Sequence, residues 1–504
     1  EIFNGFLRVA VKILNSYEIE IRGGMKMERP NIIMILTDDQ GAWAMGCAGN
    51  RDVKTPNLDR LAEEGVRFEN FFCASPVCSP ARGTIFTGRM PSAHGVLDWI
   101  RGGNVDRERL KEKSGDPYYR NEDRAIPYLE GMTTYTDILA REGYTCCLAG
   151  KWHLGDSLRP QHGFSKWFTI ARGGCLYKKA DVVENGGIRY ESRYITDVIT
   201  DKALEYIDAC RAEQNPYYIS VHYTAPHDPW DEDQHPRKYV EAYRDCAFTA
   251  TPDLPVSDRQ IQTAPYGTGE VRKSLLRGYY AAVTAMDAGV GRIVAHLKET
   301  GEYDHCILCF MADNGMNMGH HGVWGKGNAT FPLNLYDTSV KVPFLVRWPG
   351  HTEPGRVIRG LYSQYDFFPS LLSMAGISVQ AEGRMPGRSF TPVLEGAEQE
   401  AGPVVVYDEY GPNRMIRSKE WKFIRRYPYG MDELYHLTED AEETVNLAED
   451  EAYRLVREEM NDSLNHWFYR YADPAMDGAR EGVTGHGQLR RPGIYSEGKE
   501  AFFR

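Results

Sequence analysis

Short apolar runs alternate with amphipathic stretches along the first three quarters of the chain. Residues 32–36 form an unbroken apolar run that stops at Thr37-Asp38-Asp39, which is typical of a buried strand in a parallel sheet. The alternation predicts helices over residues 55–65, 134–142, 198–210, 279–302 and 366–375, and strands over residues 66–68, 144–149, 217–222 and 306–312. This order indicates an α/β fold with a large, mainly parallel sheet sandwiched by helices.

Glycine and proline become frequent between residues 383 and 396, and the pattern changes there. The remainder predicts strands over residues 404–410, 413–418, 421–427 and 434–437, and a helix over about 449–469. We expect a smaller C-terminal α+β domain, an antiparallel sheet with one covering helix. The predicted parts are an N-terminal extension (1–24), a main domain (25–380), a C-terminal subdomain (381–470) and a tail (471–504).

The charge and the hydropathy of the chain argue against a nucleic-acid-binding protein and against an integral membrane protein. The 59 Lys and Arg residues are outnumbered by 71 Asp and Glu residues, for a net charge of −12, so we expect no nucleic-acid partner. Every apolar run is far shorter than the roughly 20 residues of a transmembrane helix. Residues 1–24 lack the pattern of a signal peptide and suit an amphipathic surface helix, so we expect a cytoplasmic location of the bacterial type.

The ten cysteines show no spacing typical of a disulfide framework, which fits a reducing compartment. Cys306 and Cys309 have the spacing of half a zinc site. Both lie in an apolar run without a second pair or a histidine cluster, so we interpret them as core thiols.

The most informative stretch is residues 78–88, Cys-Ser-Pro-Ala-Arg-Gly-Thr-Ile-Phe-Thr-Gly. A cysteine-dependent phosphatase needs an arginine six positions after its cysteine, but residue 84 is Thr. A Walker-type phosphate loop would end in Gly-Lys-Ser/Thr, which is absent here. Cys-x-Pro-x-Arg followed by Thr-Gly resembles the signature of the type I sulfatases, in the alkaline-phosphatase-like superfamily. An ordinary cysteine in a proline-stiffened loop is the alternative interpretation.

The resemblance implies that a formylglycine-generating maturation enzyme oxidises Cys78 to Cα-formylglycine. The hydrated aldehyde carries two hydroxyl groups on one carbon. One attacks the sulfur of a sulfate ester, and deprotonation of the other expels sulfate. A serine would keep a stable sulfate ester. The main domain is then the catalytic sulfatase domain.

Two pairs of polar residues, Asp38-Asp39 and Asp313-Asn314, directly follow predicted strands. Ligand sites of open α/β sheets lie at such strand ends. Oxygen ligands without His or Cys select Ca²⁺ or Mg²⁺ over zinc. The resemblance assigns these four residues, with the modified Cys78, to one divalent cation, Ca²⁺ or alternatively Mg²⁺. Taken singly, each pair suits a turn or a helix cap.

Three further motifs resemble the same family. The first is Gly-Lys-Trp-His at residues 150–153. The resemblance assigns Lys151 to the sulfate and to the formylglycine, and His153 to the formylglycine hydroxyl that loses its proton when sulfate leaves. Histidine suits this proton transfer because its unperturbed pKa is ~6.5. Pro-His-Asp-Pro at residues 226–229 assigns His227 to the sulfate and to protonation of the leaving oxygen. The segment 319–326 resembles the one that brings a last sulfate-binding lysine to the site, here Lys326. With Arg82, these groups would surround a tetrahedral anion.

The substrate itself is less specified by the sequence. Candidate pocket residues are Asp98, Trp99, Arg101, His162, Arg172, Trp230 and His321. Aromatic and charged side chains together suit a sulfated carbohydrate, such as a glycosaminoglycan or mucin fragment cleaved from one end. A phosphate or phosphonate monoester hydrolase and a non-catalytic glycan-binding relative stay open as alternatives. The tail either folds over the pocket or packs against a second subunit, and the sequence indicates no oligomeric state.

Overall fold

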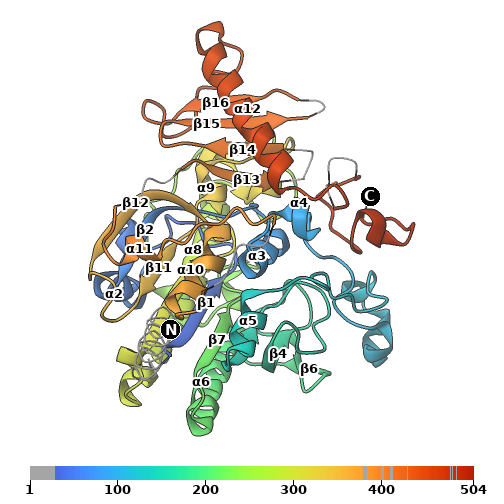
Figure 1. Ribbon diagram of the computed structural model, residues 1–504, viewed down its shortest axis with the longest axis vertical. Helices are drawn as coiled ribbons and strands as arrows, with labels where there is room; N and C mark the ends of the chain where they lie inside the picture. The colour runs from blue at the N-terminus through green and yellow to red at the C-terminus, as the bar shows by residue number, and fades with distance from the viewer. Residues whose placement is uncertain are drawn as a thin grey trace, which may run out of the picture. The chain divides into compact units, whose positions relative to one another are not determined.

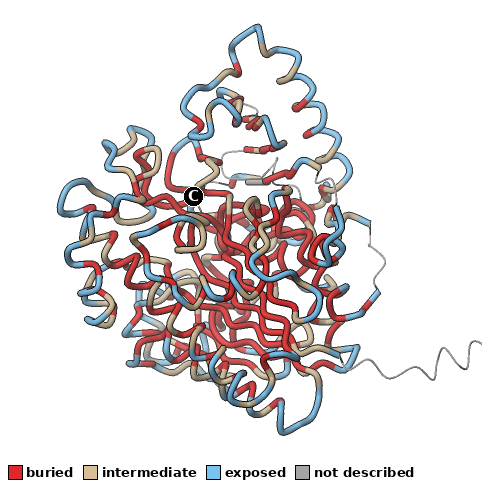
Figure 2. Tube along the Cα trace, turned by 90° about the vertical axis from the view of Figure 1, so that its left-hand side faces the viewer, coloured by how far each residue is buried: buried red, intermediate tan, exposed pale blue. Residues whose placement is uncertain are grey.

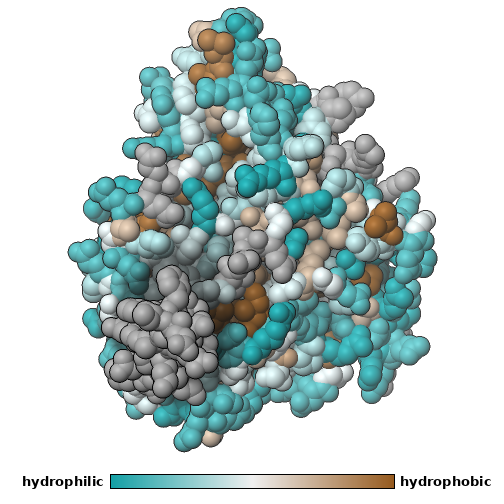
Figure 3. All heavy atoms as spheres, viewed as in Figure 1, coloured by the Kyte–Doolittle hydropathy of each residue, from teal (hydrophilic) through white to brown (hydrophobic). Residues whose placement is uncertain are grey.

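The computed structural model describes residues 29–378, 383–398, 402–408, 413–427, 430–476, 478, 481–483 and 485–503. Residues 31–504 form one compact unit. The helix expected within residues 1–24 lies outside the described residues. Among the described helices, none combines the length and the apolar character needed to cross a membrane. The face seen in Figure 3 is mainly hydrophilic.

A ten-stranded sheet runs through this unit in the order β12-β2-β11-β8-β1-β7-β3-β4-β5-β6 (Figure 1). The central neighbours are parallel: β8 (Cys306–Ala312), β1 (Asn31–Thr37), β7 (Tyr217–His222), β3 (Thr145–Gly150) and β4 (Phe164–Ile170). β2 (Val66–Phe72) and β12 (Arg356–Ser363) are also parallel to each other. β11 (Phe344–Arg347), β5 (Ala180–Glu184) and β6 (Gly187–Glu191) pair antiparallel. The predicted large, mainly parallel sheet is confirmed.

Helices cover both faces of the sheet, and β1 shows why its sequence is apolar throughout. Ile32, Met34 and Leu36 pack with α3 (Cys78–Thr87), α5 (Tyr135–Arg141) and α10 (Gln364–Met374). Ile33 and Ile35 pack on the other face with α2 (Pro56–Glu64), α6 (Ile195–Glu213) and α8 (Gly269–Glu299). Successive side chains of a strand point to opposite faces, so a strand covered on both faces is apolar at every position. Figure 2 shows the buried residues concentrated in this layer.

Several elements differ from the sequence predictions. α8 begins at Gly269, ten residues before the predicted start, because its first turns carry exposed polar residues that hide the helical period. α3 was not predicted, since all ten of its residues are buried and it shows no polar face. The strands β4, β5, β6, β11 and β12 were also not predicted. Four short helices complete the main set: α4 (Pro91–His94), α7 (Arg237–Glu241), α9 (Asp337–Val340) and α11 (Thr391–Leu394).

The C-terminal part contains an antiparallel sheet with one long helix along it, as predicted (Figure 1). Its strands are β13 (Val404–Asp408), β14 (Asn413–Arg417), β15 (Trp421–Arg426) and β16 (Glu433–His436). α12 (Arg454–Tyr471) buries Met460 and Leu464 in the same apolar cluster as Phe423. Asp337, the first residue of α9 (Asp337–Val340), forms ion pairs with this sheet, since its carboxylate lies 3.0 Å from Arg417 and 2.7 Å from Lys422. The four-part division of the chain stays a prediction.

Asp366 gives a pH-dependent contribution to stability. Its buried carboxyl group caps α10, where it accepts hydrogen bonds from the N–H groups of Ser363 (2.9 Å) and Arg388 (2.8 Å). Burial raises its pKa from 3.8 to about 7. Because the folded-state pKa is the higher one, the stabilisation is complete below the unfolded pKa and is lost as the pH rises toward 7.

We therefore expect the stability advantage of the wild type over Asp366→Asn to fall between pH 5 and pH 8, by at most roughly 3 kcal/mol. Thermal unfolding of both proteins at these two pH values measures the difference. An advantage that stays constant, or that grows with pH, contradicts this interpretation.

Candidate active site

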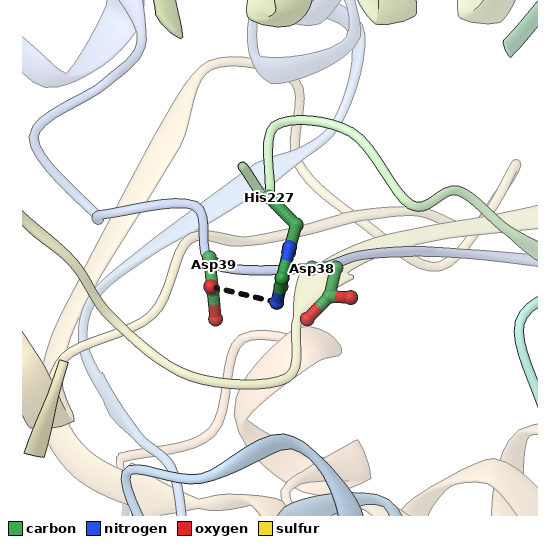
Figure 4. A group of neighbouring side chains, drawn as sticks. All are labelled: Asp38, Asp39 and His227. Atoms are coloured by element: carbon green, nitrogen blue, oxygen red, sulfur yellow. Dashed lines mark ion pairs between the residues drawn. The ribbon is translucent and has the colours of Figure 1, made fainter. Parts of the chain in front are cut away.

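Polar residues gather where the central strands end. Asp38 and Asp39 follow β1, and His227 lies in the loop after β7, the neighbour of β1. One ligand atom from each of these three residues lies within 4.8 Å of the others. Figure 4 shows the imidazole of His227 between the two carboxylates, with Nε2 3.7 Å from Oδ2 of Asp39. The structure therefore places His227 directly beside the two predicted metal ligands Asp38 and Asp39.

Asp313 and Asn314 follow β8, the other neighbour of β1, and join the same network. Oδ1 of Asp313 accepts a hydrogen bond from the N–H of Asp39 (3.2 Å). Nδ2 of Asn314 donates to Oδ1 of Asp39 (2.8 Å). The structure thus brings all four predicted metal ligands together at one edge of the sheet, as expected for the ends of adjacent parallel strands.

Two oxygen atoms of this network suit a cation. Oδ1 of Asp38 and Oδ1 of Asn314 are buried, and neither has a hydrogen-bond partner within the described part of the chain. A buried polar oxygen without a partner is costly. A divalent cation would satisfy both oxygens, and a set of carboxylate and amide oxygens suits Ca²⁺ or Mg²⁺. The residues present therefore fit the predicted ion.

Three basic side chains lie against the three carboxylates. Lys151 forms a buried ion pair with Asp38. Nζ of Lys326 lies 2.5 Å from Oδ1 of Asp39. Arg82, on α3, donates from Nε to Oδ2 of Asp313 at 2.9 Å. Since these six charges sum to zero, a bound cation would leave a positive excess, which suits a tetrahedral anion.

The pKa values of two carboxyl groups reflect this balance. Burial tends to raise the pKa of Asp38, but the charges of Lys151, His227, Lys326 and Arg82 outweigh it and hold that pKa well below its usual range. Burial and the charge of Asp38 raise the pKa of Asp313 to about 6.

His153 lies beside Cys78, the first residue of α3. Nδ1 of His153 is 3.4 Å from Sγ of Cys78, and its Nε2 is 3.1 Å from the carbonyl oxygen of Ile100. Because a carbonyl oxygen only accepts, the proton of the neutral ring is on Nε2 and Nδ1 is an acceptor. Burial and the charge of Lys151 lower the pKa of His153 well below its usual value, which keeps the ring neutral.

The thiol of Cys78 is itself a poor nucleophile in this place. Burial raises the pKa of Cys78, so the reactive thiolate is disfavoured. In this environment the unmodified side chain is therefore a thiol and not a thiolate.

Gln364 supports the site and was not predicted. Nε2 of this buried side chain, at the first position of α10, donates to the carbonyl oxygen of Asp313 (2.7 Å) and to that of Ala312 (3.1 Å). Its Oε1 accepts from the N–H of Ala74 (3.2 Å), four residues before Cys78. A glutamine at a helix start carries no sequence signal for such a role.

A pocket of about 450 Å³ opens above Cys78. Lys151, His153, His227, Lys326 and Asp39 line it. Three of the predicted substrate residues are also in its wall: Trp99, Arg101 and Arg172. The sequence did not single out several other polar wall residues, namely Tyr118, Gln262, Thr263, Asn328 and His486. They come from loops with no motif of their own, and only the fold brings them together.

Two of the predicted substrate residues have other contacts and do not line this pocket. The carboxylate of Asp98 is fully buried and accepts from the N–H groups of Trp99 (2.6 Å) and Gly487 (3.0 Å), so it shapes a loop. Nδ1 of His162 lies 3.2 Å from Oδ2 of Asp137, near the start of α5. Both predictions of substrate contact are therefore corrected.

Trp230 and His321 are corrected in the same way. Trp230 is 1 % exposed, and its indole N–H donates to the carbonyl oxygen of Pro226 at 2.8 Å. His321 stacks on Tyr336 with ring centroids 3.8 Å apart. Neither side chain is in the pocket wall.

Comparison with known proteins identifies the family of the chain. The sulfatase family model matches residues 30–377, and the model of the N-sulphoglucosamine sulphohydrolase C-terminal region matches residues 319–469. Residues 470–504 lie beyond both matched segments. The chain is 25 % identical over 530 residues to an N-acetylglucosamine-6-O-sulfatase of Bacteroides thetaiotaomicron, covering 89 % of this chain and 88 % of that relative.

Two solved structures share the fold. One is a protein in complex with its substrate D-glucosamine-2-N,6-O-disulfate, with a TM-score of 0.74 at 22 % identity over 90 % of this chain and 100 % of that chain. The other is a phosphonate monoester hydrolase of Agrobacterium radiobacter, with a TM-score of 0.65 at 20 % identity over 88 % of this chain and 96 % of that chain. Since the family model spans well over half of the sequence, the chain belongs to the sulfatase family of sulfuric ester hydrolases.

Proposed function

We propose that the protein hydrolyses a sulfate ester of a small sulfated saccharide. The proposal includes Cα-formylglycine formed from Cys78 and one divalent cation, Ca²⁺ in preference to Mg²⁺, held by Asp38, Asp39, Asp313 and Asn314. The observation that carries it is the contact of Cys78 with His153, whose Nδ1 faces residue 78 as a proton acceptor. A formylglycine-generating enzyme as a partner and a cytoplasmic location stay predictions.

The absent groups supply two pieces of chemistry. Formylglycine, when formed, supplies a hydrate with one hydroxyl that attacks sulfur and a second whose deprotonation releases sulfate. A divalent cation held by Asp38, Asp39, Asp313 and Asn314 would supply positive charge that favours binding of the sulfate group.

The protein's own residues bind the anion and move the protons. Lys151 and Lys326 line the pocket, pair with Asp38 and Asp39, and are the basic side chains that would bind the sulfate oxygens. Nδ1 of His153 accepts a proton from a hydroxyl group on residue 78.

His227 is suited to donate a proton. Burial lowers its pKa, but the charges of Asp228, Asp39 and Asp38 outweigh burial and raise it above its usual value. Nδ1 of His227 donates to the carbonyl oxygen of Asp228 at 2.8 Å. The raised pKa favours the protonated ring, and its Nε2 faces the site, 3.7 Å from Oδ2 of Asp39, where the leaving oxygen of the ester needs a proton.

The pocket supports a small saccharide. Its volume of about 450 Å³ suits one or two sugar rings, and the indole of Trp99 with the guanidinium of Arg101 offers a stacking face and charged donors. The relative that acts at the 6-O position of N-acetylglucosamine and the structure with a disulfated glucosamine point to an amino sugar.

A substrate panel tests this choice. We expect sulfate release from 6-O-sulfated N-acetylglucosamine or from a disaccharide carrying it at the non-reducing end, in the presence of Ca²⁺. Internal positions of a long chain should be resistant. A long saccharide that carries sulfate only at internal positions is the control. If it released sulfate as fast as the end-sulfated disaccharide, end-specific action would be contradicted. Faster phosphate or phosphonate release from matched aryl esters would favour the alternative hydrolase.

Gly173 and Gly174 form a matched pair for testing the position of His153. A Cβ atom at residue 173 would lie 2.1 Å from Nε2 of His153, whereas one at residue 174 would meet no atom closer than 3.9 Å. We expect Gly173→Ala to displace the imidazole and lower kcat on an aryl sulfate by on the order of 10²-fold. Gly174→Ala should stay within about threefold of the wild type. Equal losses in the two variants would contradict the assigned role of His153.

A further inference from the structure

The C-terminal tail forms part of the pocket wall. Gly485 and His486 line the pocket, although they come from the far end of the chain. The N–H of Gly487 donates to the buried carboxylate of Asp98, which precedes the pocket residue Trp99. The tail lies outside the segments matched by the family models, so the family match does not account for this arrangement.

Gln488 holds the neighbouring segment, residues 95–102, through its side chain. The residue is 0 % exposed. Its Oε1 accepts hydrogen bonds from the N–H groups of Leu97 (2.8 Å) and Asp98 (3.2 Å). Its Nε2 donates to the carbonyl oxygens of Gly95 (2.8 Å) and Arg490 (3.1 Å). All hydrogen-bonding atoms of this side chain are therefore used, and three of the four bonds cross to the segment.

The backbone of Gln488 extends the same contact along the segment. Its N–H donates to the carbonyl oxygen of Trp99 at 2.8 Å, and its carbonyl oxygen accepts from the N–H of Arg101 at 2.8 Å. Ile100 and Gln488 form a parallel β-bridge. Ile100 is thus fixed on one side by the tail.

On its other side, Ile100 contacts the active site. Its N–H donates to Oγ of Ser79 (3.1 Å), the residue that follows Cys78. Its carbonyl oxygen accepts from Nε2 of His153 (3.1 Å). This second bond determines which nitrogen of His153 carries the proton, and it orients Nδ1 toward residue 78.

We propose that Gln488 is a positioning residue of the active site, which fixes residues 95–102 and thereby places the Ile100 carbonyl that orients His153. The inference rests on the function proposed above. Gln488 is not in the pocket wall, and it acts through His153 without touching the substrate. An error of about 1 Å in the position of a proton acceptor is enough to lower the rate by up to 10²-fold.

A double-mutant cycle in the full-length protein, with residue 78 converted and Ca²⁺ present, tests this inference. The substrate is an aryl sulfate, which is too small to need the outer pocket wall. We expect Gln488→Ala to lower kcat by on the order of tenfold, with KM and inhibition by inorganic sulfate changed less than twofold. In a His153→Ala background, the same substitution should change kcat less than twofold, because the residue it acts through is absent.

Two further variants control for misfolding. Gln488→Glu keeps both accepted hydrogen bonds but sets a buried carboxylate oxygen against the carbonyl oxygens of Gly95 and Arg490, so we expect a loss at least as large as with alanine. Lys499→Ala changes an exposed residue of the same tail and should match the wild type. Formylglycine content and thermal midpoints are measured for every variant, so that incomplete conversion or unfolding is recognised.

Two outcomes would overturn the inference. One is a Gln488→Ala enzyme with wild-type kcat, and the other is an equal loss in both backgrounds. These outcomes leave the proposed function intact, because the wild type is active in both cases. A fully converted wild type that releases no sulfate from any substrate would overturn the proposed function, and this inference with it.

Discussion

Replacing Cys78 by alanine is expected to lower sulfate release by roughly four to six orders of magnitude while leaving the fold intact. The reason is that the proposed function makes residue 78 the source of the attacking hydroxyl group, next to Nδ1 of His153. Cys78 is 3 % exposed at the first position of α3, so loss of its sulfur costs about 1 kcal/mol of stability. The measurement is sulfate release under saturating substrate, together with the thermal midpoint.

Cys309→Ala is the matched control. Cys309 is 0 % exposed in β8 and packs in the core, so its truncation should cost similar stability without loss of kcat. Cys78→Ser separates the two proposed roles of residue 78, since a single hydroxyl group attacks but has no second hydroxyl to expel sulfate. We expect that variant to stop after one turnover. A Cys78→Ala protein with wild-type kcat would contradict catalysis by residue 78.

Replacing Asp38 by asparagine is expected to abolish the response to Ca²⁺ and to lower kcat by on the order of 10³-fold. In the wild type, Ca²⁺ at a hundredfold excess over its Kd should stabilise the fold by about 2.7 kcal/mol and raise the Tm. The Asn variant removes a charged ligand and the buried partner of Lys151, which costs roughly 3–5 kcal/mol in the absence of metal. Thermal unfolding with and without Ca²⁺ measures both effects.

Asp287→Asn controls for the loss of a buried carboxylate elsewhere. Asp287 is 1 % exposed in α8, where it accepts hydrogen bonds from the N–H groups of Asn57 (3.1 Å) and Leu58 (2.8 Å). This variant should be less stable but should keep the full Tm increase with Ca²⁺. An undiminished Ca²⁺ response in Asp38→Asn would show that the cation binds elsewhere.

The sequence was most informative where a single hydrophobic pattern determines the position of a strand. The run at residues 32–36 is apolar on both faces, which predicted a central strand with carboxylates at its end, and β1 has this position. The ends of β1 and β8 bring Asp38 and Asp313 together because these strands are parallel neighbours. Motifs at the ends of sheet strands therefore identified residues that the fold brings together, and their roles stay a prediction.

The outer pocket could not be predicted because no single sequence pattern determines its wall. Tyr118, Gln262 and His486 reach the pocket from separate loops, and no periodicity or motif marks them. Trp230 was expected there because aromatic residues often contact sugars, but it is buried beside Tyr279. The chemical type of a side chain does not show whether it faces a pocket or the core, since this depends on contacts between distant segments.

The most direct test of the account compares formylglycine content with activity. Preparations made with graded amounts of a formylglycine-generating enzyme are assayed for sulfate release in Ca²⁺, and the peptide containing residue 78 is quantified by mass spectrometry. The account predicts that kcat is proportional to the converted fraction and extrapolates to zero at zero conversion. Sulfate release that is independent of conversion, or phosphate release that exceeds it at full conversion, would contradict the account.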